Sequence, residues 1–251
     1  MDVSLDGKVV VITGGGGGIG SAIGRQLSSA GARIVVTYRA DSSRPLAEVA
    51  VSTFSGTGHM IVQASVETID DQQRLARAIT EEYGRVDILV NNAGVTRFVD
   101  HDDLEGLDDE LIDKIFRVNW RGSFATIRGL EPLLRESGDG LIVNISSIAG
   151  TTGIGSNVAY CASKSAINTM TKSLARSLAP AIRVISIAPG LVEGEYTRKL
   201  DASWTREQEE LTPLKRLTQA EDVARAVLAC ATLLTYSTGC VIPVDGGRPL
   251  I

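Results

Sequence analysis

The sequence predicts an α/β protein built around one doubly wound parallel sheet. Short apolar segments rich in Val and Ile alternate with longer segments of helical period along the whole chain. The apolar segments are continuous rather than interleaved with polar residues, which is typical of parallel strands covered on both faces. Because crossovers between parallel strands are right-handed, we expect helices on both sides of the sheet.

About seven strands and six helices account for most of the chain. We expect strands at residues 9–13, 33–38, 59–63, 87–91, 140–146, 182–187 and 239–244. We expect helices at residues 19–30, 44–54, 69–83, 108–135, 157–178 and 220–234. No linker, low-complexity tract or internal repeat divides this pattern, so residues 1–251 are expected to form a single domain.

The least regular stretch is 190–213, which is charged and carries Tyr196 and Trp204. It is either a surface loop with a short helix or a mobile lid over a ligand. Its length, well beyond that of the other connections, favours a substrate lid.

Composition excludes several classes of protein. The chain has 251 residues, of which 43% are hydrophobic and 22% charged, and its net charge is −5. It has no basic run, so we expect no nucleic-acid partner. No apolar stretch is long enough to span a bilayer, and the N-terminus lacks the features of a signal peptide. We therefore expect a cytoplasmic protein without a membrane partner.

The cysteines and histidines argue against a metal site. Cys161, Cys230 and Cys240 are odd in number and lack metal-ligand spacing, so we expect free thiols. His59 and His101 are the only histidines, which disfavours both a zinc centre and a Ser-His-Asp hydrolase.

A glycine-rich loop separates the first strand from the first helix. Residues 13–20 read Thr-Gly-Gly-Gly-Gly-Gly-Ile-Gly, with Gly14, Gly18 and Gly20 at the critical spacing. Glycine lets the backbone approach a phosphate closely, and the helix N-terminus supplies free N–H groups and a partial positive charge. No Lys-Ser or Lys-Thr follows the glycines, which excludes a phosphate-loop ATPase. The loop predicts a nucleotide cofactor.

A second cofactor segment follows the fourth strand. Asn92, Ala93 and Gly94 place an amide and small residues at a strand's carboxyl end, where the crevice of a doubly wound sheet lies. Taken alone, this segment is also what an ordinary turn looks like.

The chain resembles the short-chain dehydrogenase/reductase superfamily over almost its whole length. The motifs that carry the resemblance are, in order, Thr13 to Gly20, Asn91 to Gly94, Asn119, Ser147, Tyr160-Cys161-Ala162-Ser163-Lys164, Pro189-Gly190 and Val244 to Gly247. The segments 213–217 and 221–224 resemble bacterial members, including 3-oxoacyl reductases. The resemblance implies a Rossmann fold with strand order 3-2-1-4-5-6-7 and a nicotinamide dinucleotide cofactor.

The resemblance also implies which residues bind the cofactor. They are Gly14, Gly18, Ile19, Gly20, Arg39, Ser65, Val66, Asn92, Ala93, Gly94, Tyr160, Lys164, Pro189, Gly190 and Val192. Arg39 follows the second strand where an acid would accept the ribose hydroxyl of NAD, and its charge suits the 2′-phosphate of NADP(H). We favour NADP(H) and leave NAD(H) open. The chain departs from the family pattern at Ser65, where an aspartate is usual, and at Ile185, where an asparagine is common.

Tyr160 and Lys164 are the core of the predicted chemistry. They lie four residues apart, on one face of a helix. A tyrosine pKa near 10 is too high for proton exchange at neutral pH, and a nearby ammonium lowers it. Ser147 follows the fifth strand and precedes Tyr160 by the family's spacing, although Ser146 is a neighbouring alternative. By resemblance, Asn119 maintains a water-linked proton path to Lys164.

The implied activity is hydride transfer between nicotinamide and a carbonyl or secondary alcohol, without a metal. In reduction, Ser147 would orient the carbonyl oxygen and Tyr160 would supply its proton. Oxoacyl thioesters, small ketones and sugar alcohols remain side by side as small-molecule substrates. The wall residues we expect are Val95, Phe98, Thr152, Ile154, Val192, Tyr196 and Trp204.

Two other functions and one assembly complete the expectations. The alternatives are a catalytically silent nucleotide sensor on the same fold and an NAD-preferring alcohol dehydrogenase. The resemblance implies a homotetramer, or next a dimer, in which the helices at 108–135 and 157–178 pair between subunits.

Overall fold

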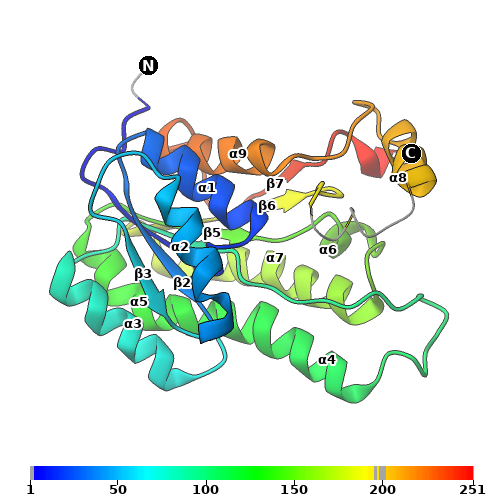
Figure 1. The fold of residues 1–251 in the computed structure, drawn as a ribbon, viewed down its shortest axis with the longest axis horizontal. Coiled ribbons are helices and arrows are strands. Elements are labelled where there is room, and N and C mark those ends of the chain that lie inside the picture. The colour runs from blue at the N-terminus through cyan, green and yellow to red at the C-terminus, as the bar shows by residue number, and fades with distance from the viewer. Residues whose placement is uncertain (1–2, 195–196, 198–201, 251) are drawn as a thin grey trace.

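The fold is organised around one seven-stranded parallel sheet (Figure 1). It is seen in a computed structural model that describes residues 3–194, 197 and 202–250. The strand order is β3-β2-β1-β4-β5-β6-β7, which confirms the predicted fold class and order. The strands are β1 (Val9–Ile12), β2 (Arg33–Tyr38), β3 (Met60–Gln63), β4 (Ile88–Asn91), β5 (Gly140–Ile145), β6 (Ile182–Pro189) and β7 (Val241–Val244).

Helices cover both faces of this sheet. The helices are α1 (Gly18–Ser29), α2 (Arg44–Ser52), α3 (Ile69–Glu82), α4 (Asp109–Phe116), α5 (Ser123–Glu136), α6 (Ala149–Thr152), α7 (Val158–Leu178), α8 (Ala202–Leu211) and α9 (Ala220–Thr232). Helices α1, α2 and α9 pack on one face, and α3, α5 and α7 pack on the other (Figure 1).

Alternating burial explains the continuous apolar strands. In β1, Val10 and Ile12 face the core beneath α1 and α9, whereas Val9 and Val11 face the core beneath α5 and α7. All four side chains are at most 2% exposed. A strand buried on both sides has no solvent face, so it shows no polar alternation.

The order in which strands are added to the sheet reverses between β1 and β4, and two loops meet there. The Thr13 hydroxyl oxygen accepts hydrogen bonds from the backbone N–H groups of Asn92 and Ala93, both at 3.0 Å. The Asn92 side-chain amide donates to the carbonyls of Thr13 at 3.0 Å and Gly14 at 3.1 Å. These bonds join the glycine loop to the loop after β4 at the switch point, where ligands bind in this type of sheet.

The expected helix at 108–135 is the largest difference from the sequence analysis. It consists of α4, a π-helical segment at Arg117–Gly122, and α5. Apolar periodicity does not distinguish one widened turn from a regular helix, so the segment could not be predicted. Asp108 caps α4 by accepting a hydrogen bond from the Leu111 N–H at 2.8 Å. The short helix α6 was also not predicted, and the remaining predicted ends differ by about one or two residues.

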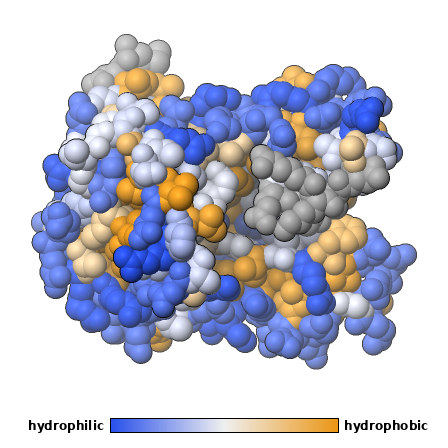
Figure 2. Space-filling model, viewed as in Figure 1, coloured by the Kyte–Doolittle hydropathy of each residue, from blue (hydrophilic) through white to orange (hydrophobic). Residues whose placement is uncertain are grey.

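The surface seen in Figure 2 is mainly hydrophilic, with local groups of hydrophobic residues. Within the described parts of the chain, no helix combines the length and hydrophobicity that crossing a membrane requires. The three cysteines carry free thiols, as predicted, and Cys161 and Cys230 are buried.

Gly20 is expected to be essential to the join between the two loops. A Cβ at this position would lie 2.7 Å from the Gly14 carbonyl oxygen and 2.8 Å from the Asn92 amide nitrogen, whereas one at Gly18 would meet nothing within 4 Å. Gly20→Ala should therefore lower the free energy of unfolding by about 1–3 kcal/mol. Gly18→Ala is the matched control and should change it by less than about 0.5 kcal/mol. Urea denaturation measures both, and equal stability of the two variants would contradict the steric argument.

Candidate active site

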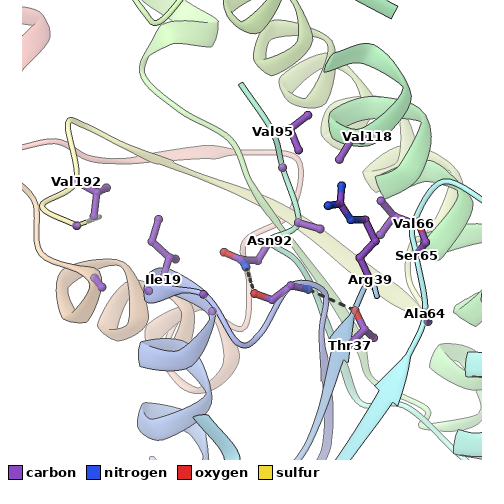
Figure 3. A pocket seen from close by; sticks show the side chains of 18 of the residues that line it. Ile19, Thr37, Arg39, Ala64, Ser65, Val66, Asn92, Val95, Val118 and Val192 are labelled. Atoms are coloured by element: carbon purple, nitrogen blue, oxygen red, sulfur yellow. Dashed lines mark hydrogen bonds between the residues drawn. The ribbon is translucent and has the colours of Figure 1, made fainter. Parts of the chain in front are cut away.

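A cavity of about 560 Å³ lies at the switch point (Figure 3). Its volume suits a cofactor or drug-sized ligand. The predicted cofactor residues in its wall are Gly14, Gly18, Ile19, Gly20, Arg39, Ser65, Val66, Asn92, Ala93, Gly94 and Val192. Pro189, Gly190, Tyr160 and Lys164, which were also predicted, are not part of this wall.

The N-terminus of α1 opens onto this cavity without a cap of its own. Its N-cap residue is Gly17, no side chain accepts a hydrogen bond there, and the first turn contains no acidic residue. Unpaired N–H groups and the helix dipole together favour an anion. Gly17, Gly18 and Gly20 line the same wall, so a phosphate can approach the backbone closely.

Arg39 and Ser65 lie at the β2 side of the cavity. The Arg39 side chain is exposed, and in the view of Figure 3 its guanidinium end points toward the side of Val118. It forms no ion pair with any residue that the structure describes, so its charge is available to a ligand. The Ser65 hydroxyl oxygen accepts a hydrogen bond from the Glu67 N–H at 3.2 Å. This serine therefore shapes the turn as well as the wall.

Tyr160 and Lys164 are held in the first turns of α7. Asn157 caps the helix by accepting a hydrogen bond from the Tyr160 N–H at 2.7 Å. One turn later, the Lys164 Nζ atom lies 5.5 Å from the centre of the Tyr160 ring. The same Nζ atom donates to the Ile145 carbonyl at 2.8 Å, at the end of β5. The predicted pair is therefore close together and tied to the sheet.

Ser147 meets this pair from the end of β5. A hydrogen bond with its hydroxyl is one of the causes that act on the Tyr160 pKa, and it lowers that pKa. Helix α6, which follows it, packs so tightly on α7 that a Cβ at Gly150 would lie 2.6 Å from the Lys164 carbonyl carbon. The alternative, Ser146, is 3% exposed and donates to the Lys164 carbonyl oxygen at 3.2 Å. The geometry therefore places Ser147, rather than Ser146, beside the phenol.

Asn119 is fully buried in the π-helical segment and braces the loop after β4. Its Oδ1 accepts from the Val95 N–H at 2.8 Å, and its Nδ2 donates to the Val95 carbonyl and the Ser163 hydroxyl, both at 3.1 Å. A Cβ built on Gly94 would lie 3.4 Å from Asn119 Oδ1 and 3.8 Å from Lys164 Nζ. The two predicted residues thus flank Gly94, at the wall of the cavity.

Burial controls the proton affinities of the pair. It raises the pKa of Tyr160 above its ordinary value, while the hydrogen bond from Ser147 opposes the rise and the nearby Cys161 adds to it. Burial also lowers the pKa of Lys164 to about 8. The Tyr160 pKa is therefore raised overall in this structure, not lowered as the sequence analysis expects. Both charged forms are penalised, and the Lys164 charge is directed at a backbone carbonyl.

The predicted wall residues and lid are only partly placed. Val95 and Val192 line the cavity, whereas Phe98 and Ile154 are 58% and 76% exposed and lie outside its wall, as do Thr152 and Trp204. Helix α8 occupies part of the expected lid and carries Trp204, which is 37% exposed. Tyr196 lies outside the described residues.

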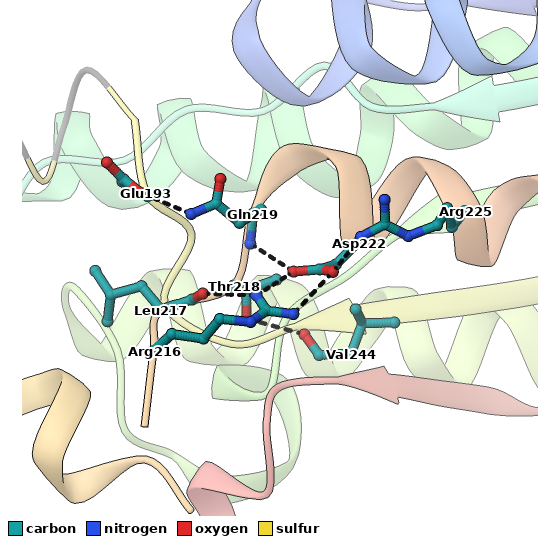
Figure 4. Close-up of polar contacts among 8 residues, drawn as sticks. All are labelled: Glu193, Arg216, Leu217, Thr218, Gln219, Asp222, Arg225 and Val244. Carbon is teal, nitrogen blue, oxygen red and sulfur yellow. Dashed lines mark hydrogen bonds and ion pairs between the residues drawn. The ribbon is translucent and has the colours of Figure 1, made fainter. Parts of the chain in front are cut away.

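A charged cluster lies near the Val192 side of the cavity, outside its wall (Figure 4). Asp222 accepts hydrogen bonds from Arg216 at 2.5 and 3.0 Å and from Arg225 at 2.6 Å, and these partners lower its pKa to about 2. The segment it anchors pairs with the loop after β6, where Val192 forms a β-bridge with Thr218. Val192 is thereby fixed at the wall.

Several wall residues were missed by the sequence analysis. They are Gly17, Thr37, Ala64, Glu67, Val118, Glu193, Gly194 and Ala220. Most are immediate neighbours of predicted positions, so the motifs located the right loops. Asn157 carried a usable signal, because an asparagine at the start of a helical stretch is a typical N-cap.

Comparisons with known proteins agree with this geometry. Residues 14–248 match a family model described as Enoyl-(Acyl carrier protein) reductase. The chain is 37% identical over 248 residues to a Streptomyces violaceoruber protein named for the granaticin polyketide synthase as its ketoacyl reductase 2, covering 98% of each chain. It is 36% identical over 256 residues to the 3-oxoacyl-[acyl-carrier-protein] reductase FabG of Aquifex aeolicus, covering 98% of this chain and 99% of that one.

The fold of this chain is also similar to that of a solved structure. The Pseudomonas aeruginosa RhlG/NADP active-site complex aligns with a TM-score of 0.89 at 31% identity, covering 99% of this chain and 98% of that one. The family match spans nearly the whole chain, and the relatives cover it end to end at more than 30% identity. The chain belongs to the short-chain dehydrogenase/reductase superfamily and is a 3-oxoacyl-reductase-like oxidoreductase of that superfamily.

Proposed function

We propose that this chain is an NADP(H)-dependent reductase of a carbonyl group, with 3-oxoacyl thioesters as the favoured substrate class. The observation that carries the proposal is the meeting of Ser147, Tyr160 and Lys164 beside a glycine-lined cavity. The names of the relatives favour an oxoacyl substrate over a small ketone or a sugar alcohol.

The residues at the cavity fit a nicotinamide dinucleotide. Gly14, Gly18, Ile19 and Gly20 would hold its pyrophosphate at the uncapped end of α1. Arg39 would pair with a 2′-phosphate, because its guanidinium has no carboxylate partner within the described residues. When bound, this group supplies or accepts the hydride.

Tyr160 and Ser147 would manage the substrate oxygen. In reduction, the Tyr160 hydroxyl donates its proton to the carbonyl oxygen, and the Ser147 hydroxyl donates a hydrogen bond to the same atom. Because burial raises the Tyr160 pKa, the phenol stays protonated at neutral pH and is ready to act as an acid. Because reduction consumes a proton, oxidation becomes more favourable as the pH rises.

Lys164 and Asn119 would support that proton transfer. Below pH about 8, Lys164 carries its charge one helical turn from the phenol and stabilises the phenolate that remains after the proton leaves. Asn119 keeps Val95 and Gly94 beside Lys164. A water-linked proton path through Asn119 stays part of the proposal.

Two alternatives remain for the test. A catalytically silent nucleotide sensor would bind the cofactor without turnover, and an NAD-preferring alcohol dehydrogenase would disregard the charge of Arg39. A cytoplasmic homotetramer, or a dimer, also stays a prediction.

Near the start of α5, the rings of Trp120 and Phe124 stack on each other, with their centres 6.1 Å apart. The Trp120 side chain is 37% exposed.

Removing the phenol tests the reaction itself. Wild-type protein should oxidise NADPH when offered 3-oxoacyl thioesters in a spectrophotometric screen of carbonyl compounds. Tyr160→Phe should reduce turnover by about 10²–10⁴-fold and leave cofactor affinity within about twofold, because only the proton donor is lost. Tyr83→Phe, whose parent hydroxyl bonds the Gly58 carbonyl at 2.7 Å, is the control and should retain activity. Full turnover by Tyr160→Phe would disprove the acid role.

Replacing Arg39 tests the choice of cofactor. Arg39→Leu should raise the KM for NADPH by about tenfold to a hundredfold, the loss of one charge-assisted contact, and should leave the KM for NADH nearly unchanged. Arg33→Leu, at the other end of β2, is the control. An equal effect of Arg39→Leu on both cofactors would remove the proposed phosphate contact.

The buried Lys164 predicts a pH dependence of stability. Between pH about 8 and 10.5 the unfolded chain binds a proton that the folded chain has lost, so stability should rise with pH across this window, by up to roughly 3 kcal/mol. Lys164→Met should abolish this rise and be at least as stable as wild type at pH 7. Lys172→Met, at an exposed site on the same helix, should leave the rise intact. Denaturant titrations at several pH values measure it, and an unchanged profile in Lys164→Met would contradict the assignment.

A further inference from the structure

The layer between the sheet and α7 changes from apolar to polar close beneath the site. The apolar row, paired in register across three strands, consists of Leu89, Ile142 and Val184. Two residues further toward the carboxyl ends, the paired row consists of Asn91, Asn144 and Ser186. The members of this polar row are at most 3% exposed.

Directional hydrogen bonds link the polar row to α7. Asn91 Nδ2 donates to Asn144 Oδ1 at 2.9 Å, and Asn144 Nδ2 donates to the Thr171 hydroxyl at 2.9 Å. At the next strand, the Ser186 hydroxyl lies 3.3 Å from Asn168 Oδ1 and can donate to it. Asn144 therefore connects β4 with α7, because it bonds Asn91 on the strand and Thr171 on the helix.

These bonds select one position of the helix on the sheet. An apolar contact tolerates small shifts, because one set of van der Waals neighbours replaces another. A buried amide or hydroxyl that loses its partner costs about 1–3 kcal/mol, so the polar row penalises any slip or rotation of α7. Only Asn91 Oδ1 in this row lacks a hydrogen-bond partner among the described residues, at the end away from α7.

The contact with α7 continues residue by residue along β5 to the site. After Asn144, the Ile145 carbonyl accepts from Lys164 Nζ and the Ser146 hydroxyl donates to the Lys164 carbonyl. Ser147 then meets Tyr160. Tyr160 and Lys164 share one helix and move together, whereas Ser147 moves with the sheet. The meeting of Ser147 with Tyr160 therefore depends on the register of α7 on β5.

We propose that Asn144, acting through Thr171, is a positioning residue that sets this register and so places Tyr160 against Ser147. Ser186 and Asn168 do the same one strand further along. The inference rests on the proposed function, because it assigns the contact between Ser147 and Tyr160 a role in turnover.

Paired threonine variants test the inference. Thr171→Val removes the hydroxyl that Asn144 binds and keeps the shape of the side chain. Thr126→Val is the matched control, because Thr126 is also fully buried but bonds the Gly122 carbonyl one turn back on its own helical stretch. Thr171→Val should lower kcat about tenfold or more with cofactor affinity within twofold, and Thr126→Val should leave kcat within twofold. Thr171→Ser restores the hydroxyl and should recover most of the lost kcat.

A second variant and a second readout keep the test decisive. Ser186→Ala perturbs the same row from β6 and should also lower kcat. This variant replaces Thr171→Val in the test if Thr171→Val does not fold. The tyrosinate absorbance, taken as the difference between each protein and its Tyr160→Phe version, follows the titration of Tyr160 without turnover. Its midpoint should move to higher pH in Thr171→Val, because the bond from Ser147 lowers the Tyr160 pKa.

The outcomes separate the register inference from the proposed function. Two groups shift the Tyr160 pKa, Cys161 on its own helix and Ser147 after β5, and the Lys164 Nζ atom lies 5.5 Å from the ring centre. His101, from the segment before α4, forms its hydrogen bond with the Gly155 carbonyl. If the wild-type protein shows no turnover, the proposed function is wrong. The Tyr160 titration, which needs no turnover, still tests whether the polar row sets the register of α7. The inference is overturned when both Thr171→Val and Ser186→Ala show the same kcat and the same Tyr160 titration midpoint as Thr126→Val.

Discussion

The attachment of α7 to the end of β5 is the constraint on which the rest of the site depends. Four successive residues of the sheet side, Asn144 to Ser147, bond one helix. A helix supplies Tyr160 and Lys164 at a fixed mutual spacing, but only its docking decides what they face. Buried polar contacts do this better than apolar ones, because they are lost abruptly when the register changes.

The cofactor side follows a different physical principle. The switch point between β1 and β4 separates the two loops, and Thr13 with Asn92 holds them at a fixed distance. What these loops offer a ligand is backbone N–H groups and a helix end. The positive side-chain charge in the cavity wall comes from Arg39. Under the proposed function, the main chain would recognise the phosphates, and the choice between NADP(H) and NAD(H) would rest on one side chain.

Proton chemistry is where sequence reasoning was least complete. The spacing of Tyr160 and Lys164 correctly placed both groups on one face, and the structure keeps them close. The spacing did not reveal that burial would raise the Tyr160 pKa and lower that of Lys164 to about 8. Desolvation depends on everything packed around a group, including residues far away in the chain. The resulting protonated phenol is suited to donating a proton at neutral pH.

The sequence by itself predicted the strands and the glycine loop, because these follow from local periodicity and composition. The strand order and the candidates Asn119, Ser147, Tyr160 and Lys164 came from ordered motifs that resemble the superfamily. Only the tertiary structure decided that Asn119 lies in a π-helical segment, that Ser147 rather than Ser146 bonds the phenol, and that Asn144 meets Thr171. These outcomes depend on contacts between segments distant in sequence. Local propensity does not encode such contacts, since they exist only once the helices are packed on the sheet.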